Sequence, residues 1–295
     1  MITLLRRVKN RLAAAIGQKG ANLSVQVSRG RQFQTFTGAD GTDLLESAIA
    51  TFKQWDAIPD RRTLLPVGTR NAATRDAWIE KVLTALPPGT RLLDAGAGEM
   101  QYKKFCQHLD YVSQDLAEYD GSGNSVGLQT GGWNTTGIDI VSDVCDMPVD
   151  DASFDAVLCT EVLEHVADPV AAVREMARVL RPGGKIIITA PFCSLTHFAP
   201  YHYATGFNKY FYSHHLTTLG FRDIKVEENG NFFEFVAQEL RRIQTMAEKY
   251  AGSKLTAEGE FAISTLLSVL QDYSDRDSGS SEMLHFDCQV TATKN

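Results

Sequence analysis

Long apolar runs and cysteine-rich motifs are missing from this sequence of 295 residues. A membrane-spanning helix needs roughly 18 or more consecutive apolar residues, and no such uninterrupted stretch occurs. The five cysteines are odd in number and irregularly spaced, which argues against a disulfide framework or a zinc site and indicates a reducing compartment. With 43% hydrophobic and 22% charged residues, the chain has the composition of a globular protein, and we expect it to be cytoplasmic.

Acidic residues are absent before Asp40, although the whole chain carries a net charge of −7. Seven basic residues give this first stretch a charge of +7: Arg6, Arg7, Lys9, Arg11, Lys19, Arg29 and Arg31. Since the total is −7, the rest of the chain carries −14. Proteins that act on nucleic acid usually present a basic face, so the charge predicts that nucleic acid is not a partner.

Apolar residues recur at roughly helical spacing among the basic residues at the N-terminus, between Ile2 and Ile16. A signal peptide is a poor interpretation, because arginines and a lysine interrupt the apolar region. Two interpretations remain. The segment is a basic amphipathic helix that rests on an anionic membrane surface or a partner, or it is a helix packed on its own domain with a solvated basic face.

Strands and helices alternate along the rest of the chain, after a helix and a loop that begin near residue 40. Short apolar or alternating segments predict seven strands, over residues 91–95, 110–115, 138–144, 154–160, 185–190, 221–227 and 286–293. Helical apolar spacing predicts helices over residues 74–86, 101–109, 170–180, 235–250 and 257–273. Such alternation is typical of a parallel sheet with right-handed crossovers. Residues 121–132 (GSGNSVGLQTGG) are expected to form a flexible loop.

A glycine turn, Asp94 to Glu99 (DAGAGE), ends the first of these predicted strands. Its glycines allow the backbone to approach a ligand closely at the ligand-binding edge of the sheet. Asp115 ends the next strand, where an acid can hydrogen-bond both hydroxyls of an adenosine ribose. Taken alone, the turn is also compatible with a tight connection that binds no ligand.

The full dinucleotide pattern GxGxxG is absent, because Glu99, Met100, Gln101 and Tyr102 follow Gly98. A pyrophosphate is disfavoured beside the carboxylate of Glu99. The acid instead suits a cationic ligand, which favours a sulfonium or an amine over NAD.

Four segments in this order resemble the class I S-adenosylmethionine-dependent methyltransferases. They are Leu92–Gly98, Asp115, residues 143–148 (DVCDMP) with 154–157 (FDAV), and residues 161–166 (EVLEHV) followed by 180–184 (LRPGG). The resemblance covers roughly residues 74–240 and the last ten residues. Within the family, the chain is similar to the methyltransferase type 11 group, including members of bacterial glycan or secondary-metabolite pathways.

The resemblance implies an α/β fold, a Rossmann-like seven-stranded sheet whose last strand is antiparallel, with helices on both faces. It predicts an N-terminal basic and helical extension over residues 1–70 and a methyltransferase domain over 71–295. A helical insertion over residues 235–282 would precede the last strand and cap the pocket or mediate dimerisation. Met100 departs from the family, many of whose members have a third glycine at this position.

The resemblance also implies S-adenosyl-L-methionine as the cofactor and assigns residues to it. Asp94 would support the loop and the methionine ammonium, Gly96 and Gly98 would let the backbone pass close, and Asp115 would hold the ribose. The other residues implied at the cofactor are Glu99, Asp146 facing the adenine amino group, Met147 near the ring, and Thr160 and Glu161 beside the methionine end. His165 would have a structural or supporting role.

The segment over residues 192–216 is a candidate acceptor pocket, because it is rich in histidine and aromatic residues and follows the fifth strand. His202, His197 and Tyr203 are the candidate catalytic bases, since histidine accepts protons near neutral pH. A packed aromatic subdomain with polar core histidines is the alternative. No cluster of carboxylates occurs beyond the cofactor set, so no metal is expected.

These observations predict a methyltransferase that acts on a small-molecule or glycan-type acceptor, by O-methylation of a sugar or polysaccharide component. Two alternatives stay open. One is a non-catalytic, methyltransferase-like subunit that binds a partner, and the other is an NAD-dependent oxidoreductase. A homodimer and peripheral membrane contact through the basic N-terminus are further expectations.

Overall fold

The computed structural model describes residues 23–29, 32–38 and 65–295. The N-terminal amphipathic helix and the helix predicted from residue 40 lie outside these ranges. The chain divides into two compact units. One comprises residues 1–69 and 236–277, and the other comprises residues 70–235 and 278–295.

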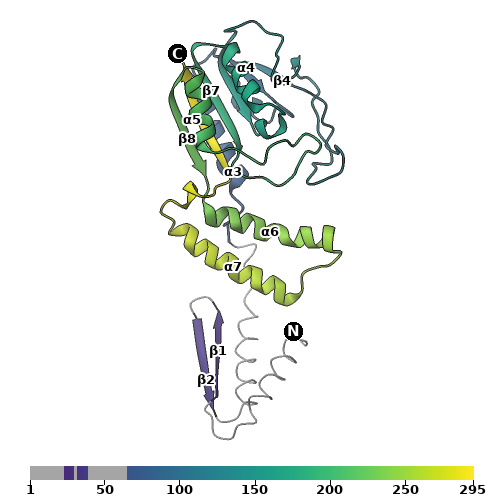
Figure 1. Cartoon of the computed structure of the whole chain (residues 1–295), viewed down its shortest axis with the longest axis vertical. Coiled ribbons are helices and arrows are strands. Elements are labelled where there is room, and N and C mark those ends of the chain that lie inside the picture. The colour runs from purple at the N-terminus through teal and green to yellow at the C-terminus, as the bar shows by residue number, and fades with distance from the viewer. Residues whose placement is uncertain (1–22, 30–31, 39–64) are drawn as a thin grey trace. The chain divides into compact units, whose positions relative to one another are not determined.

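The second unit is built on a seven-stranded sheet, labelled in part in Figure 1. Its strands are β3 (Arg91–Ala95), β4 (Asp110–Asp115), β5 (Ile140–Val141), β6 (Phe154–Thr160), β7 (Leu180–Pro191), β8 (Phe221–Asn229) and β9 (Asp287–Lys294). Their order is β5-β4-β3-β6-β7-β9-β8. The pairs among β3 to β7 are parallel, whereas β9 is antiparallel to both β7 and β8. This confirms the predicted methyltransferase-like sheet and its antiparallel last strand.

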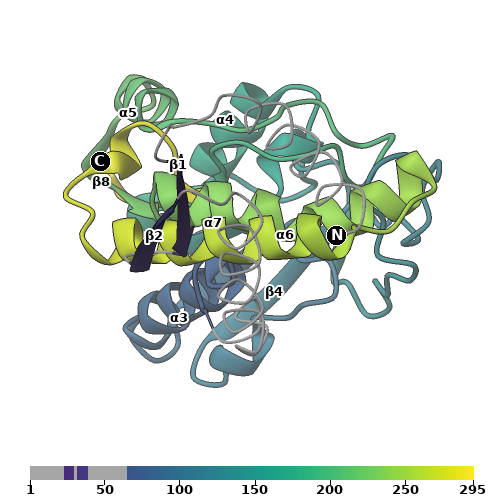
Figure 2. The same ribbon diagram turned by 90° about the horizontal axis from the view of Figure 1, so that it is seen from below.

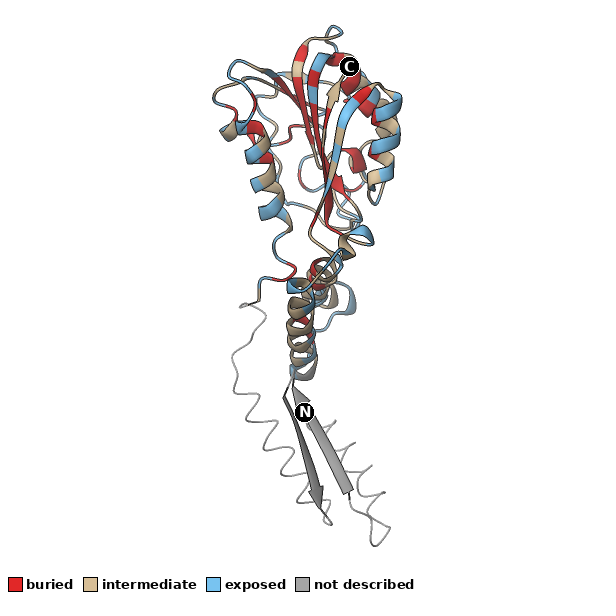
Figure 3. Cartoon of the chain, turned by 90° about the vertical axis from the view of Figure 1, so that its left-hand side faces the viewer, coloured by how far each residue is buried: buried red, intermediate tan, exposed pale blue. Residues whose placement is uncertain are grey.

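Two apolar layers cover the two faces of this sheet. On one face, α3 (Asn71–Thr84) packs Ile79 and Leu83 against strand residues that include Leu92 and Leu158. On the other face, α4 (Pro169–Val179) and α5 (Lys209–Thr218) pack against the alternate strand residues, Leu93 among them. Adjacent strand residues point to opposite faces, so the nearly continuous apolar strands serve both layers. Figure 3 shows these buried residues along the middle of the sheet.

The predicted helix over residues 101–109 is wrong. Only a 3₁₀ turn, Lys103–Phe105, forms there, within a series of hydrogen bonds between residues three apart. The segment is short and rich in aromatic and other weak helix formers. Consecutive tight turns instead bury the side chains of Tyr102 and Cys106 beneath the sheet.

Three further differences separate prediction from structure. The predicted strand over residues 138–144 contracts to the two residues of β5, an edge strand paired only with β4. Helix α5 lies within the predicted pocket segment, where no helix was expected; Asn208 caps its N-terminus. Strands β1 (Leu23–Arg29) and β2 (Gln32–Gly38) form an antiparallel pair in a region expected to be helical.

Two long helices belong to the insertion before the last strand, as predicted. They are α6 (Phe232–Ala251) and α7 (Ala257–Asp275), which run next to each other in Figure 1 and overlap when viewed from below in Figure 2. Ala237 of α6 packs with Ile263 and Leu267 of α7 in a separate apolar cluster. In the described part of the chain, no helix combines the length and apolarity needed to cross a bilayer.

Replacing Leu93 by alanine tests the central layer. Leu93 is fully buried in β3, so Leu93→Ala should lower the free energy of unfolding by about 2–5 kcal/mol through lost burial and a cavity. Chemical denaturation measures this change. Leu195 is 39% exposed, and Leu195→Ala should stay within about 0.5 kcal/mol of the wild type. Equal effects of the two substitutions would contradict the assigned packing.

Candidate functional site

A cavity of about 330 Å³ opens beside the carboxyl ends of β3, β4 and β6. This edge is where open α/β sheets bind ligands. Its lining residues are Gly96, Gly98, Gln114, Asp115, Leu116, Glu118, Tyr119, Trp133, Asp143, Val144, Glu161, Val162, His165, Val166, Ala167, Phe198, Tyr201 and Tyr203. Five residues predicted for the site are among them: Gly96, Gly98, Asp115, Glu161 and Tyr203.

The glycine turn after β3 forms one wall of the cavity. Gly96 and Gly98 have φ angles of 75° and 52°, in the left-handed region that glycine favours. A Cβ at Gly96 would lie 2.4 Å from a Val162 methyl carbon, and one at Gly98 would lie 2.6 Å from the Trp133 ring. Larger residues would therefore strain the turn and collide with its neighbours.

Asp115 is held in place by two backbone amides. Gly98 N–H donates to Oδ2 at 2.9 Å, and Ala117 N–H donates to Oδ1 at 2.8 Å. Each carboxylate oxygen keeps further lone pairs for a ligand. The predicted ribose acid is thus present at the cavity in a fixed orientation.

Met100, at the position where many family members have a third glycine, has a left-handed backbone conformation. Its φ is 55°, which is uncommon for a residue with a side chain. Its N–H donates to Ala97 O at 2.7 Å. A positive φ that glycine would favour is therefore adopted here by a residue with a side chain.

Asp94 lies behind the turn and does not line the cavity. It is 2% exposed, and the Tyr111 hydroxyl donates to its Oδ2 at 2.6 Å. Burial raises its pKa to about 7, although the Tyr111 hydrogen bond opposes the shift. Its position fits the predicted support of the loop.

Four other predicted cofactor residues also lie outside the lining. Glu99 is exposed and accepts Asn134 N–H at 3.1 Å, and Thr160 is the last residue of β6. Asp146 is exposed, while Met147 is only 2% exposed and belongs to the apolar core. Asp143, three residues before Asp146, lines the cavity instead.

An aromatic wall faces the glycine turn. Tyr119 stacks on Phe198 with ring centroids 4.4 Å apart, and Trp133 meets both rings edge-on. Phe198, with Tyr201 and Tyr203, comes from the predicted acceptor segment. Of the other aromatics of that segment, Phe207 and Tyr212 are buried in the core, whereas Tyr210 is exposed.

Tyr119 and Trp133 flank the glycine-rich loop and were not predicted for the site. The loop pairs with the acceptor segment, since Leu128 N–H donates to Thr196 O and Phe198 N–H donates to Leu128 O, both at 3.0 Å. Its glycines permit this close approach, because a Cβ at Gly127 would lie 2.3 Å from Thr196 O. The loop expected to be flexible is therefore bonded to the acceptor segment, and Tyr119 and Trp133 on either side of it line the cavity.

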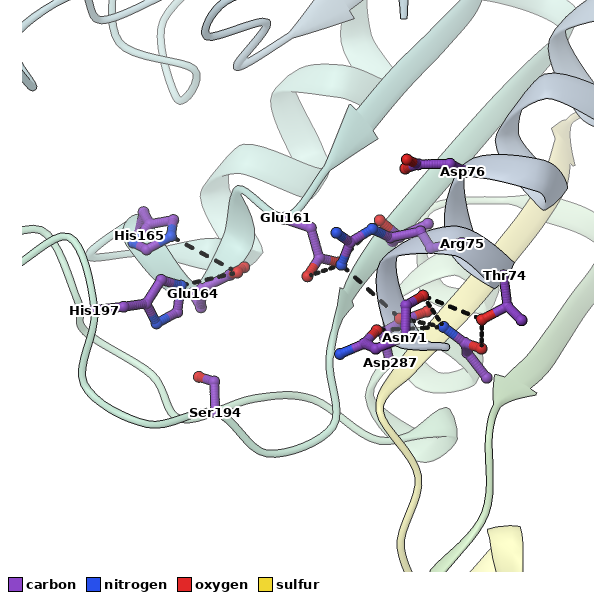
Figure 4. A network of polar contacts seen from close by, with 12 residues as sticks. Asn71, Thr74, Arg75, Asp76, Glu161, Glu164, His165, Ser194, His197 and Asp287 are labelled. Atoms are coloured by element: carbon purple, nitrogen blue, oxygen red, sulfur yellow. Dashed lines mark hydrogen bonds and ion pairs between the residues drawn. The ribbon is translucent and has the colours of Figure 1, made fainter. Parts of the chain in front are cut away.

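Glu161 connects the cavity to a partly buried ion pair. Its Oε2 lies 2.6 Å from Nη1 of Arg75, which projects from α3 (Figure 4), and its Oε1 accepts the Thr189 hydroxyl. Asp287 of β9 lies 4.0 Å from the same guanidinium nitrogen and accepts a hydrogen bond from Asn229 Nδ2. Burial and the charge of Glu161 raise the pKa of Asp287 to about 8. Nothing in the sequence marks Arg75 as a site residue, because it lies outside the recognised motifs.

Three histidines gather at the other side of Glu161. The ring of His197 lies 4.6 Å from that of His165 and 4.9 Å from that of His202, measured between centroids. His165 lines the cavity, whereas His197 and His202 do not. Burial and neighbouring imidazoles lower the pKa of His165 to about 4 and lower that of His202, and burial raises the pKa of Glu164.

Comparison with known proteins agrees with this architecture. Residues 93–188 match the sequence family described as "Methyltransferase domain". The chain is 37% identical over 154 residues to a ubiquinone biosynthesis O-methyltransferase of Xanthomonas axonopodis pv. citri (strain 306), covering 50% of this chain and 60% of that protein. It is 34% identical over 148 residues to a demethylmenaquinone methyltransferase of Clavibacter sepedonicus, covering 47% and 56%. This chain thus spans less than two thirds of these relatives' lengths.

A solved structure of a SAM-dependent methyltransferase from Archaeoglobus fulgidus resembles the chain with a TM-score of 0.46 and 15% identity. That comparison covers 75% of this chain and 94% of the other.

The order and directions of the strands are those of the Rossmann-like, class I methyltransferase fold. Residues 93–188 match the methyltransferase domain family, and the cofactor that this match implies is S-adenosylmethionine. The residues present fit that cofactor, because a close-approach glycine turn and an oriented carboxylate lie at one cavity wall.

Replacing Asp94 by asparagine tests its buried charge. Because its pKa rises from 3.8 to about 7 on folding, the folded state binds more protons than the unfolded state between about pH 4 and 7. Stability from this group is therefore present at low pH and is lost as the pH rises through that window. Asp94→Asn keeps an acceptor for Tyr111 and removes this dependence.

Urea denaturation from pH 4.5 to 8 compares the two proteins. The wild type should lose up to about 1.4 kcal/mol per pH unit relative to Asp94→Asn across the window. Parallel stability curves would show that Asp94 has an ordinary pKa.

Proposed function

We propose that this protein transfers a methyl group from S-adenosylmethionine to a hydroxyl oxygen of a small acceptor that has a flat apolar face. One observation carries the proposal. A single cavity has the glycine turn and Asp115 on one wall and the rings of Tyr119, Trp133 and Phe198 on another. The first wall suits an adenosyl group, and the second excludes water and suits a flat acceptor.

The cofactor residues divide by their position around the cavity. Asp115 would accept hydrogen bonds from the ribose hydroxyls, while Gly96 and Gly98 leave room for the ligand beside the backbone. Glu161, held by Arg75 and Thr189, would face the cationic methionine end. Asp143 lines the cavity and would be the acid that faces the adenine. Asp146, which the sequence predicted for this role, lies three residues farther along the same loop. These roles are part of the proposal.

Two acceptor classes fit a flat apolar face. Two curated relatives are named ubiquinone biosynthesis O-methyltransferase and demethylmenaquinone methyltransferase, and the first name supports a hydroxylated ring. A sugar ring, the acceptor predicted from the sequence, also stacks on aromatic side chains through its apolar face. The hydroxylated ring and the sugar ring both carry a hydroxyl group with another polar group beside it.

S-adenosylmethionine, when bound, supplies a methyl carbon made electrophilic by its sulfonium sulfur. The acceptor oxygen forms a bond to this carbon as the carbon–sulfur bond breaks, and S-adenosylhomocysteine leaves. The sulfur keeps the electron pair of the broken bond, which neutralises the sulfonium. The hydroxyl proton must pass to a base, and in this proposal His202 receives it.

His202 is suited to this role because its lowered pKa keeps it neutral at pH 7. Its Nε2 lies 3.2 Å from the Ser194 hydroxyl, and its ring packs on His197. Tyr203, at the cavity wall, would orient the acceptor.

Calorimetric titration with S-adenosylhomocysteine tests the cofactor site. The wild type should bind with micromolar affinity, and Asp115→Ala should weaken binding at least about tenfold, or 1.4 kcal/mol. Asp110→Ala, at the opposite and exposed end of the same strand, is the matched control and should bind like the wild type.

The remaining outcomes distinguish the alternatives. Absence of binding in the wild type would contradict the enzyme and favour a non-catalytic, partner-binding subunit. Binding of NAD in place of S-adenosylhomocysteine would favour the oxidoreductase.

Replacing His202 by glutamine tests the proton transfer. Methylation of phenolic and sugar acceptors, measured with radiolabelled S-adenosylmethionine, should identify which class is used. On that acceptor, His202→Gln should lower kcat by about 100-fold or more and leave S-adenosylhomocysteine affinity within about twofold. His214→Gln, on the exposed surface of α5, is the control. An unchanged kcat in His202→Gln would remove this residue from the mechanism.

A further inference from the structure

Glu164 is a buried carboxylate with no partner to match its charge. Its side chain is fully buried, and neither of its oxygens accepts a hydrogen bond from another residue. A buried polar group without a partner is costly, and an ionised carboxylate is more costly still. Such a group in a folded protein requires an explanation.

Two imidazoles face this carboxylate with unprotonated nitrogens. Nε2 of His165 lies 3.7 Å from Glu164 Oε1, and Nε2 of His197 lies 3.8 Å from the same oxygen. Nδ1 of His165 bonds to Tyr201 O, and Nδ1 of His197 bonds to Leu195 O. A carbonyl oxygen only accepts, so Nδ1 carries the proton in each neutral ring. Both Nε2 atoms therefore keep their lone pairs, as metal-binding histidines do.

We propose that Glu164, His165 and His197 bind a divalent transition-metal ion. In the described part of the chain, their ligand atoms all lie within 4.8 Å of one another, and Figure 4 shows the carboxylate pointing at the two rings. Metal–ligand bonds of about 2.1 Å place neighbouring ligand atoms roughly 3 to 3.5 Å apart. Small side-chain movements would close the present arrangement to that size.

The donor set selects among cations. Imidazole nitrogens suit iron, nickel, copper and zinc, and carboxylate oxygens suit manganese as well as magnesium and calcium. Two imidazoles and one carboxylate leave coordination positions open, as in metal sites that bind a substrate.

The local charge also favours a cation. The carboxylates of Glu161, Glu164 and Asp287 lie around the guanidinium of Arg75, which contacts the first at 2.6 Å and the last at 4.0 Å. Arg75 neutralises only one of these carboxylates, so a second ionised carboxylate leaves the group with excess negative charge. A divalent ion at Glu164 would offset that excess.

The site adjoins the cavity, because His165 and Glu161 line it. A metal ion lowers the pKa of a bound hydroxyl group. On the proposed function, the ion would hold an acceptor hydroxyl, and its proton would leave for His202, the histidine outside the ligand set.

Metal titration of the full chain tests the site without cofactor or acceptor. Protein stripped with a chelator is titrated with Mn²⁺, followed by electron paramagnetic resonance and calorimetry. We expect about one site per chain. Glu164→Gln and His197→Gln should each weaken binding at least about tenfold, whereas His214→Gln should bind like the wild type. Mg²⁺ should bind more weakly than Mn²⁺.

Nitrogen couplings in the wild-type Mn²⁺ spectrum give a second readout that needs no variant. Couplings from two imidazoles support the site even if Glu164→Gln fails to fold. Absence of binding, absence of those couplings, or equal affinity in wild type, Glu164→Gln and His197→Gln would overturn it and leave a shared proton as the partner of Glu164. S-adenosylhomocysteine binding is measured separately, so failure of either proposal leaves the other standing.

Discussion

The hydrogen bond from Gly98 N–H to the Asp115 carboxylate joins the turn after β3 to the end of β4. The wall formed by the glycine turn depends on it, because it orients an acid and an open backbone segment toward one cavity. The bond requires adjacent parallel strands that end together, which the pairing of β3 with β4 provides. It also requires glycine, because Gly98 has a positive φ and packs against Trp133. Sheet register, turn conformation and aromatic wall are therefore connected through one short contact.

A second constraint is the burial of charge beside the cavity. Arg75 crosses from α3 to Glu161 and Asp287, and thereby ties a helix to the ends of β6 and β9. Removing one member of such a group lowers stability more than replacing the whole group by apolar residues, because the remaining charges stay buried without partners. Glu164 lies at the edge of this group without a cation of its own, next to His165 and His197. Glu161 and His165 of these groups line the cavity, where a bound ligand would contact them.

Sequence reasoning was most successful where local rules suffice. The apolar runs at β3 and β6 and the glycine turn were predicted at the residues where they lie, because strand burial and turn conformation depend on neighbours in the chain. The helix over residues 101–109 was wrong, because burial of Tyr102 and Cys106 in the core outweighed a weak helical tendency. Likewise, Asp143 rather than Asp146 reaches the cavity, since the bend of a loop determines which of two nearby acids faces inward.

The sequence by itself determined the class of fold, the cofactor family, and the cluster of aromatic and histidine residues after the fifth strand. The alternation of strands and helices follows from local periodicity, whereas the cofactor is implied by the resemblance of the motifs to class I methyltransferases. Only the tertiary structure decided that Arg75 meets Glu161, that Trp133 and Tyr119 close the wall, and that Glu164 faces two histidines. The reason is physical: such contacts join side chains from distant segments, and their partners are set by how helices and loops pack on the sheet.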